Sequence, residues 1–152
     1  MNSENTVKLL QKYSFVNNSI RYLREEGQSS PFELFLFECE DGWYDLLDRT
    51  FGEMQSAARF PEEIYIAQVK EKWAGLRIYF SCHSDDFETL RFIVDQAESQ
   101  SYKICEKCGK KGSIRDLIGY QTLCATHYKE KKAYYQKQID RFKRFEKVKE
   151  DE

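Results

Sequence analysis

Three cysteines and one histidine near the C-terminal end of the chain have the spacing of a metal site. Two residues separate Cys105 from Cys108, two separate Cys124 from His127, and fifteen lie between the pairs. A Cys-x-x-Cys turn lets two thiolates converge on one ion, and thiolates with imidazole suit tetrahedral zinc. Because catalytic zinc keeps an open position and four protein ligands fill the shell, we predict a structural Zn²⁺.

The surrounding sequence indicates how these ligands are positioned. Gly109 suits a tight turn after Cys108, because glycine adopts a positive φ without steric cost. Short strands are expected at 113–116 and 119–123, and a long helix over 125–147 begins with the second ligand pair. A knuckle, a hairpin and ligands at a helix start follow one another in the order of a treble-clef zinc finger.

The first hundred residues are predicted to fold as a mixed body. Helices are expected over 4–26 and 41–58 and again from 85, a strand over 32–39, and a hairpin from strands 64–72 and 76–82. Asp41 and the Asp85–Glu88 pair are placed to cap the second and third helices. The predicted fold class is α+β, a small antiparallel sheet with packed helices followed by a treble-clef-like zinc module that ends in a long helix.

Charge divides the chain into two parts. Residues 1–100 carry 18 acidic and 10 basic side chains, whereas 101–152 carry 14 basic and 8 acidic ones. We therefore predict an acidic body, 1–100, and a zinc module with a basic helix, 101–152, docked on it. Basic patches attract nucleic acid or an acidic partner, although a solvated helix has the same composition. The candidate nucleic-acid contacts are Lys110, Lys111, Lys131, Lys132, Arg141 and Arg144.

The remaining residues with chemical potential form no recognised catalytic motif. The sequence has no phosphate-binding glycine loop, no G-x-S-x-G and no H-E-x-x-H. A further candidate polar site combines Glu38 and Asp41 with Lys70 and Arg77, but helix capping and surface ion pairs explain the same residues. The two cysteines outside the metal motif are interpreted as buried thiols. We predict that the chain is not an enzyme.

Composition also bears on location. No N-terminal apolar run follows a basic start, and no stretch approaches the roughly 20 apolar residues of a membrane span. Reduced thiolate ligands suit a cytosol. We therefore expect a cytoplasmic protein that has no membrane partner.

Three segments carry a resemblance to known proteins. They are Asp41–Leu47 (a Gly-Trp-aromatic-Asp helix start), Gln68–Phe80 (a Val-Lys-Glu-Lys hairpin), and Ile104–Gly109 leading to Leu123-Cys124 (a zinc-finger-like segment). Together they resemble a loose group of small, uncharacterised bacteriophage and prophage proteins. The resemblance covers about residues 38–128. It implies a phage or mobile-element context, and so a bacterial host cytoplasm, but no established activity.

These observations lead to two functional hypotheses. The first is a non-enzymatic, zinc-stabilised binding protein that contacts a host protein, with interference with a defence system as one use. The alternative is a nucleic-acid-binding accessory protein that uses the basic zinc module and the C-terminal helix. That helix is also a candidate for pairing with a second copy, which would make a homodimer.

Overall fold

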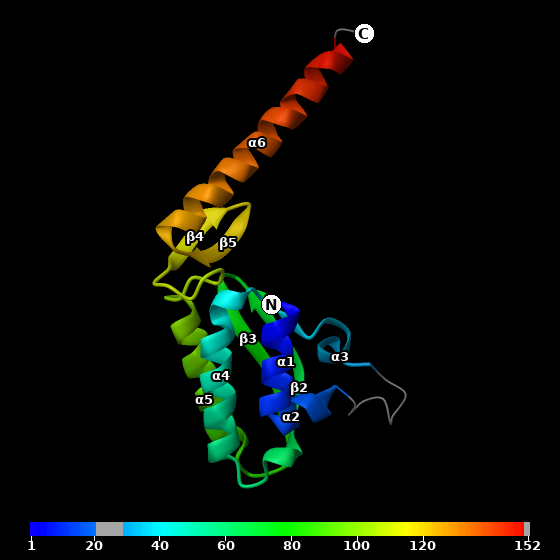
Figure 1. The fold of residues 1–152 in the computed structure, drawn as a ribbon, viewed down its shortest axis with the longest axis vertical. Coiled ribbons are helices and arrows are strands. Elements are labelled where there is room, and N and C mark those ends of the chain that lie inside the picture. The colour runs from blue at the N-terminus through cyan, green and yellow to red at the C-terminus, as the bar shows by residue number, and fades with distance from the viewer. Residues whose placement is uncertain (21–28, 151–152) are drawn as a thin grey trace.

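A computed structural model describes residues 1–20 and 29–150, with side chains described as far as Arg144 (Figure 1). The body contains helices α1 (Ser3–Lys12), α2 (Ser14–Ser19), α3 (Pro31–Phe35), α4 (Tyr44–Ala57) and α5 (Phe87–Ser101), with strands β1 (Phe37–Glu38), β2 (Ile64–Lys72) and β3 (Gly75–Cys82). Short 3₁₀ turns, Asp41–Trp43 and Pro61–Glu63, precede α4 and β2. The C-terminal part contains β4 (Ser113–Leu117), β5 (Gly119–Leu123) and α6 (Ala125–Glu150). The predicted α+β class is confirmed.

The body sheet has the strand order β1-β2-β3. Strands β2 and β3 form the predicted antiparallel hairpin, with Val69 opposite Ile78 and a bulge between Ile66 and Gln68. The short β1 adds a parallel pair to β2. Strand β3 therefore lies at one edge of this sheet.

The core lies between the helices and one face of this sheet. In Figure 1, α1 lies in front of the strands, α4 lies beside it, and α5 lies next to α4, with which it is in contact. Edge-on aromatic contacts join the elements, with ring centroids 5.9 Å apart for Phe15 and Phe51 and 5.2 Å for Phe32 and Phe37. Trp43 at the start of α4 is fully buried. This core fixes the 41–43 segment, against which the metal-site part of the chain packs.

The prediction of a strand over 32–39 was wrong for most of its length. Residues Pro31–Phe35 form α3, and only Phe37–Glu38 is extended. The Ser30 hydroxyl caps the amide of Glu33, and proline at the first helical position has a φ suited to a helix. These start signals outweighed the apolar run. Leu36, at φ 51°, then ends the helix.

The predicted helix over 4–26 is broken. Helix α1 ends at Lys12 and α2 starts at Ser14, because Tyr13 takes an extended conformation between them. The predicted residues 21–26 lie outside the described part of the chain. The predicted caps also differ. Asp41 does not cap the helix that follows it, and the N-cap position of α5 is Asp86, not the predicted Asp85, with no side-chain cap hydrogen bond. Asp41 instead accepts hydrogen bonds from the Asn2 amide and the Asn5 side chain at the start of α1.

Helix α6 extends away from the body beyond β4 and β5 (Figure 1). It runs three residues further than the predicted 125–147. Only its first turns touch the hairpin, and most of its described side chains after Lys131 are exposed. Within the described residues, no helix is long and apolar enough to cross a membrane.

Candidate metal centre

The four predicted ligands converge. The ligand atoms of Cys105, Cys108, Cys124 and His127 all lie within 4.8 Å of one another. The sulfurs of Cys108 and Cys124 are 3.9 Å apart, close to the spacing of about 3.8 Å that a tetrahedron with zinc–sulfur bonds of about 2.3 Å requires. His127 Nδ1 lies 3.4 Å from the Cys105 sulfur and 3.3 Å from that of Cys124. The group can hold a metal ion.

Backbone hydrogen bonds shape the first ligand pair into a knuckle. The Gly109 amide donates to the Cys105 carbonyl, and the Cys105 amide donates to the Lys110 carbonyl. Gly109 has the positive φ, 73°, that the sequence predicted for this turn. The Glu106 amide donates to the Thr122 carbonyl at the end of β5. The hairpin thus holds the knuckle next to the helix that carries the other two ligands.

The second ligand pair lies where α6 begins. The His127 amide donates to the Cys124 sulfur and lowers the pKa of that thiol to about 7. Burial raises the pKa of Cys105, although backbone amides oppose this effect. The ring of His127 turns Nδ1 toward the sulfurs, while its Nε2 lies 4.0 Å from a carboxylate oxygen of Glu130. This distance is too long for a hydrogen bond, so Glu130 is a charged neighbour of the ring and not its hydrogen-bond acceptor.

The knuckle packs directly on the start of α4. The indole nitrogen of Trp43 donates to the Ile104 carbonyl at 2.9 Å. A Cβ at Gly42 would collide with the carbonyl oxygens of Cys105 and Glu106 and with the Cys108 amide. Only glycine therefore allows the backbone of residue 42 to approach the metal loop this closely.

The β2–β3 turn also packs against the C-terminal part of the chain, through the end of strand β5. Its two central residues, Trp73 and Ala74, both have positive φ, as a type I′ turn requires. The Thr122 hydroxyl donates to the Ala74 carbonyl at 2.8 Å, and a Glu71 carboxylate oxygen accepts from the Ala74 amide. We call the contact among residues 41–43, 71–75 and 104–112 with Thr122 the joint. All three segments that carry the phage-protein resemblance meet at it.

Glu106 belongs to this joint and was not singled out from the sequence. Its side chain is buried, and one carboxylate oxygen accepts from the Glu40 amide at 3.1 Å. Burial raises its pKa to about 7. A glutamate between two cysteine ligands is expected to be an exposed, charged residue, so nothing in the sequence indicated this buried contact.

The candidate polar site is gathered in part: Glu38, Lys70 and Arg77 lie in one row across the sheet, because Lys70 is the register partner of both others, whereas Asp41 lies in the turn before α4. Glu38, in β1, accepts from the Gln68 side chain, whereas Asp41 accepts from the start of α1. The Lys70 ammonium lies 5.5 Å from the ring centre of Tyr79. Arg77 forms an ion pair with Glu98 at 2.9 Å, at the opposite edge of the sheet from β1. Each of the four side chains thus has its own structural partner.

The two other cysteines have different surroundings. Cys39 is buried, and burial raises its pKa to about 12, so its thiol stays protonated at neutral pH. The Cys82 sulfur is half-buried and 2.9 Å from the Ser84 hydroxyl.

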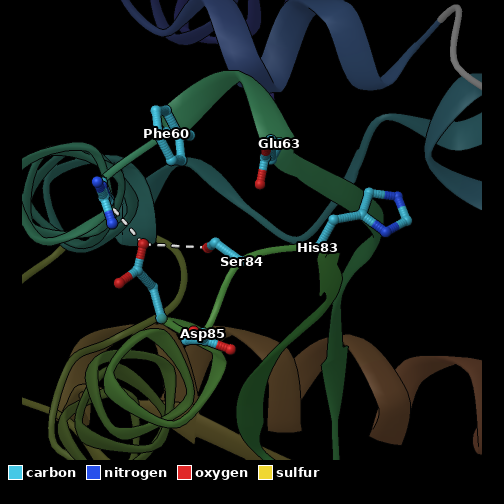
Figure 2. A pocket seen from close by; sticks show the side chains of 7 residues that line it. Phe60, Glu63, His83, Ser84 and Asp85 are labelled. Atoms are coloured by element: carbon cyan, nitrogen blue, oxygen red, sulfur yellow. Dashed lines mark hydrogen bonds between the residues drawn. The ribbon is translucent and has the colours of Figure 1, made fainter.

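A cavity of about 230 Å³ adjoins that hydroxyl, between the exit of α4 and the start of α5 (Figure 2). Ser84 donates to Asp86, which also accepts from the Arg59 amide. Figure 2 shows the ring of His83 pointing away from this pair, and it contacts Tyr65 edge-on. The histidine is therefore not placed as a base for the serine.

The six basic residues singled out for nucleic acid lie on the knuckle and on α6. All are exposed except Lys131, which is half-buried. Tyr120, on β5, is 49% exposed, and the guanidinium of Arg115 covers the ring of Tyr128 at 5.0 Å. The basic side chains thus extend from the metal module along the helix.

Comparison of the chain with family models, with curated proteins and with solved structures gave no match in any of the three. The fold and the site define it as an α+β protein with a Cys₃His group that can hold a metal ion.

Proposed function

We propose that the chain is a zinc-stabilised binding protein whose helix α6 contacts a partner protein. The observation that carries this proposal is the projection of α6 away from the body (Figure 1). Apolar side chains that stay exposed on a projecting helix do not contribute to the packed core, and such exposed apolar surface marks interaction sites. Ile139 is 40% exposed and Phe142 68%.

The metal has the role of fixing the direction of α6. Three thiolates and one imidazole are a donor set that zinc favours, and four protein donors occupy every position of a tetrahedron. The ligands Cys124 and His127 lie at the base of α6, and Cys105 and Cys108 lie in the knuckle that packs on the body. A zinc ion bound by all four therefore ties the helix to the joint. The ion acts structurally in this proposal.

The apolar residues of α6 form a stripe suited to a groove. Tyr135, Ile139 and Phe142 follow the i, i+4, i+7 spacing that places side chains on one helix face. Basic side chains flank them, including Lys131, Lys132 and Arg141. The partner surface that fits is an apolar groove with an acidic rim. The same basic charge opposes pairing of α6 with a second copy, so sedimentation should find a monomer.

The partner that we propose is a bacterial host protein. The support for this step is the resemblance of the 41–47, 68–80 and 104–124 segments to phage and prophage proteins. A phage protein that contacts a host protein can counteract a defence system, and this is the use that we propose.

Site-specific crosslinking tests the role of α6. In one variant, a photo-crosslinking phenylalanine analogue replaces Ile139. In the matched control, the same analogue replaces Lys137, on another face of the same helix. Both variants are produced and irradiated in bacterial cells. We expect one protein to crosslink through position 139 and not through 137. Equal products from both positions, or none from 139, would contradict the proposal.

Nucleic-acid binding is the second candidate function. The exposed basic side chains of the knuckle and of α6, with Tyr120 beside them, favour it. Phosphate contacts make affinity fall steeply with salt. Fluorescence anisotropy of labelled DNA and RNA at two salt concentrations should then show salt-sensitive binding that Lys131→Glu with Lys132→Glu, or Arg141→Glu with Arg144→Glu, weakens. Absent or salt-insensitive binding removes this candidate.

A further inference from the structure

A groove of about 250 Å³ lies between strand β3 and helix α5, away from the metal ligands and from α6. Its strand wall is the continuous segment 77–80. Its helix wall is one stripe of α5, made up of Phe87, Arg91, Val94, Asp95 and Glu98. The Phe80 and Phe87 rings meet at one end, 5.3 Å apart, and the Arg77–Glu98 ion pair marks the other. The groove therefore follows the middle of β3.

This wall is the outer edge of the body sheet, because β3 pairs only with β2 among the described strands. In an antiparallel pair, successive residues direct their backbone groups alternately toward the partner strand and away from it. The two-residue turn makes Lys72 and Gly75 a hydrogen-bonded pair. Counting from Gly75, Arg77 and Tyr79 face β2, and Leu76, Ile78 and Phe80 face outward.

The protein itself caps the first of these outward residues. The Leu76 amide donates to the Ser101 hydroxyl at 2.8 Å, and the Leu76 carbonyl accepts from the Arg77 guanidinium at 3.1 Å. Both contacts agree with the outward direction deduced from the register. In residues 1–20 and 29–150, no corresponding hydrogen bond caps the outward groups of Ile78 or Phe80. Two donors and two acceptors of the edge thus remain available at the groove.

We propose that this groove binds an extended peptide segment of a partner protein, which adds to β3 as a further strand. An edge strand with unpaired backbone groups is the template for this mode of recognition, in which main-chain hydrogen bonds supply affinity and pockets select side chains. The helix wall from Phe87 to Glu98 spans about 16 Å at about 1.5 Å per residue. A strand of about five residues has the same length.

The lining defines the peptide that fits. Phe80, Phe87 and Val94 form an apolar wall, so a peptide side chain directed at α5 should be aromatic or aliphatic. Arg91 and Asp95, both more than half exposed, border the groove with opposite charges and favour polar residues beside it. Proline is excluded where the peptide amide pairs with the edge, because it has no N–H to donate. The motif is therefore an alternating apolar and polar segment of about five residues.

The site goes beyond the proposed role of α6 and does not depend on it. Every residue that lines the groove belongs to the body, and none of the described residues after Gln100 is among them. A chain whose α6 has no partner can still bind a peptide here, so the two proposals fail separately.

Selection from a displayed library of random peptides on the full zinc-loaded chain tests the site. The discriminating pair of variants is Phe87→Glu, which places a charge in the groove, and Phe92→Glu, which makes the same change on α5 outside it. We expect selected peptides to bind Phe87→Glu at least about tenfold more weakly than the unmodified chain, and Phe92→Glu within about twofold of it. An empty selection, or equal effects of the two variants, would overturn the proposal.

Amide exchange on the unmodified chain gives a second test that survives misfolding of Phe87→Glu. In the free protein, the amides of Arg77 and Tyr79 should be protected, and those of Ile78 and Phe80 should exchange quickly. Bound peptide should protect Ile78 and Phe80 as well. If these two amides are already protected in the free chain, or stay unprotected with peptide bound, strand addition is wrong.

Discussion

The backbone amide of Gly42 donates a 2.7 Å hydrogen bond to the carbonyl oxygen of Glu106. One residue opens the helix start of the body, and the other lies between two metal ligands. The metal loop and the body are therefore connected through main-chain atoms, which cannot move aside as a flexible side chain would. This contact makes the joint sensitive to a single added methyl group.

Replacing Gly42 by alanine should destabilise the protein by about 3 kcal/mol, the upper end of what overpacking costs, because the new Cβ would collide with three backbone atoms of the metal loop. Chemical denaturation followed by circular dichroism measures the free energy of unfolding. Gly52→Ala is the matched control, since its Cβ would meet only the Tyr13 hydroxyl at 3.3 Å and alanine favours a helix. Equal stability of the Gly42→Ala chain and the unmodified chain would show that the joint can open.

Removing the metal with a chelator should loosen residues 104–127 before the body unfolds. Metal binding supplies much of the folding energy of such a module. Mass-spectrometric hydrogen exchange should show lost protection at the amides of Cys105, Glu106 and Gly109, all of which are hydrogen-bonded in the structure. Elemental analysis should find one zinc ion per chain, lost in Cys124→Ser and retained in Cys82→Ser. Unchanged protection in the metal-free chain would contradict a structural role for the ion.

Ser101→Ala should cost about 1–3 kcal/mol of stability, because it leaves the buried amide of Leu76 without its acceptor. The Ser101 side chain is fully buried and also donates to the Glu98 carbonyl. Ser99→Ala, on the same helix but exposed, removes only a hydroxyl that donates to the Asp95 carbonyl. Its effect should stay within about 0.5 kcal/mol. Thermal melts of the two variants compare them directly.

Asp41→Ala should lower stability by about 1 kcal/mol at neutral pH, through the contacts that Asp41 makes with α1. The Asn2 amide, the largest cause, holds the pKa of Asp41 below its usual value. The folded state therefore favours the carboxylate, and this stabilisation is present above the unfolded pKa of about 4 and is lost as the pH falls through the lower folded value. Unfolding curves from pH 7 to 3 should show the difference between Asp41→Ala and the unmodified chain shrinking, whereas Asp85→Ala should show little difference throughout.

The elements predicted with least error were those with regular patterns. The β2–β3 hairpin, α4 and the long C-terminal helix follow from alternation or from three- and four-residue spacing. Segment 31–38 misled because its apolar residues fit either a strand or a short helix. The Ser30 cap and Pro31 decided the outcome, a local signal that the apolar run concealed.

The metal ligands were readable because their spacing is local. The joint could not be predicted from the sequence, because it depends on contacts between residues far apart in the chain, such as Trp43 with Ile104 and Ala74 with Thr122. The groove beside β3 was also unreadable, since the sequence does not give the strand order. An edge strand and a central strand of the same composition look alike until the sheet is assembled.

The length of helix α6 amplifies small rotations at its base. Its 26 residues reach about 39 Å from the metal ligands at its base, at about 1.5 Å per residue. A rotation of about 10° at the joint would then sweep the far end through about 7 Å, more than the width of a side chain. The angular stiffness of the few hydrogen bonds around Gly42, Trp43 and Ala74 thus sets how accurately the far end of α6 is aimed.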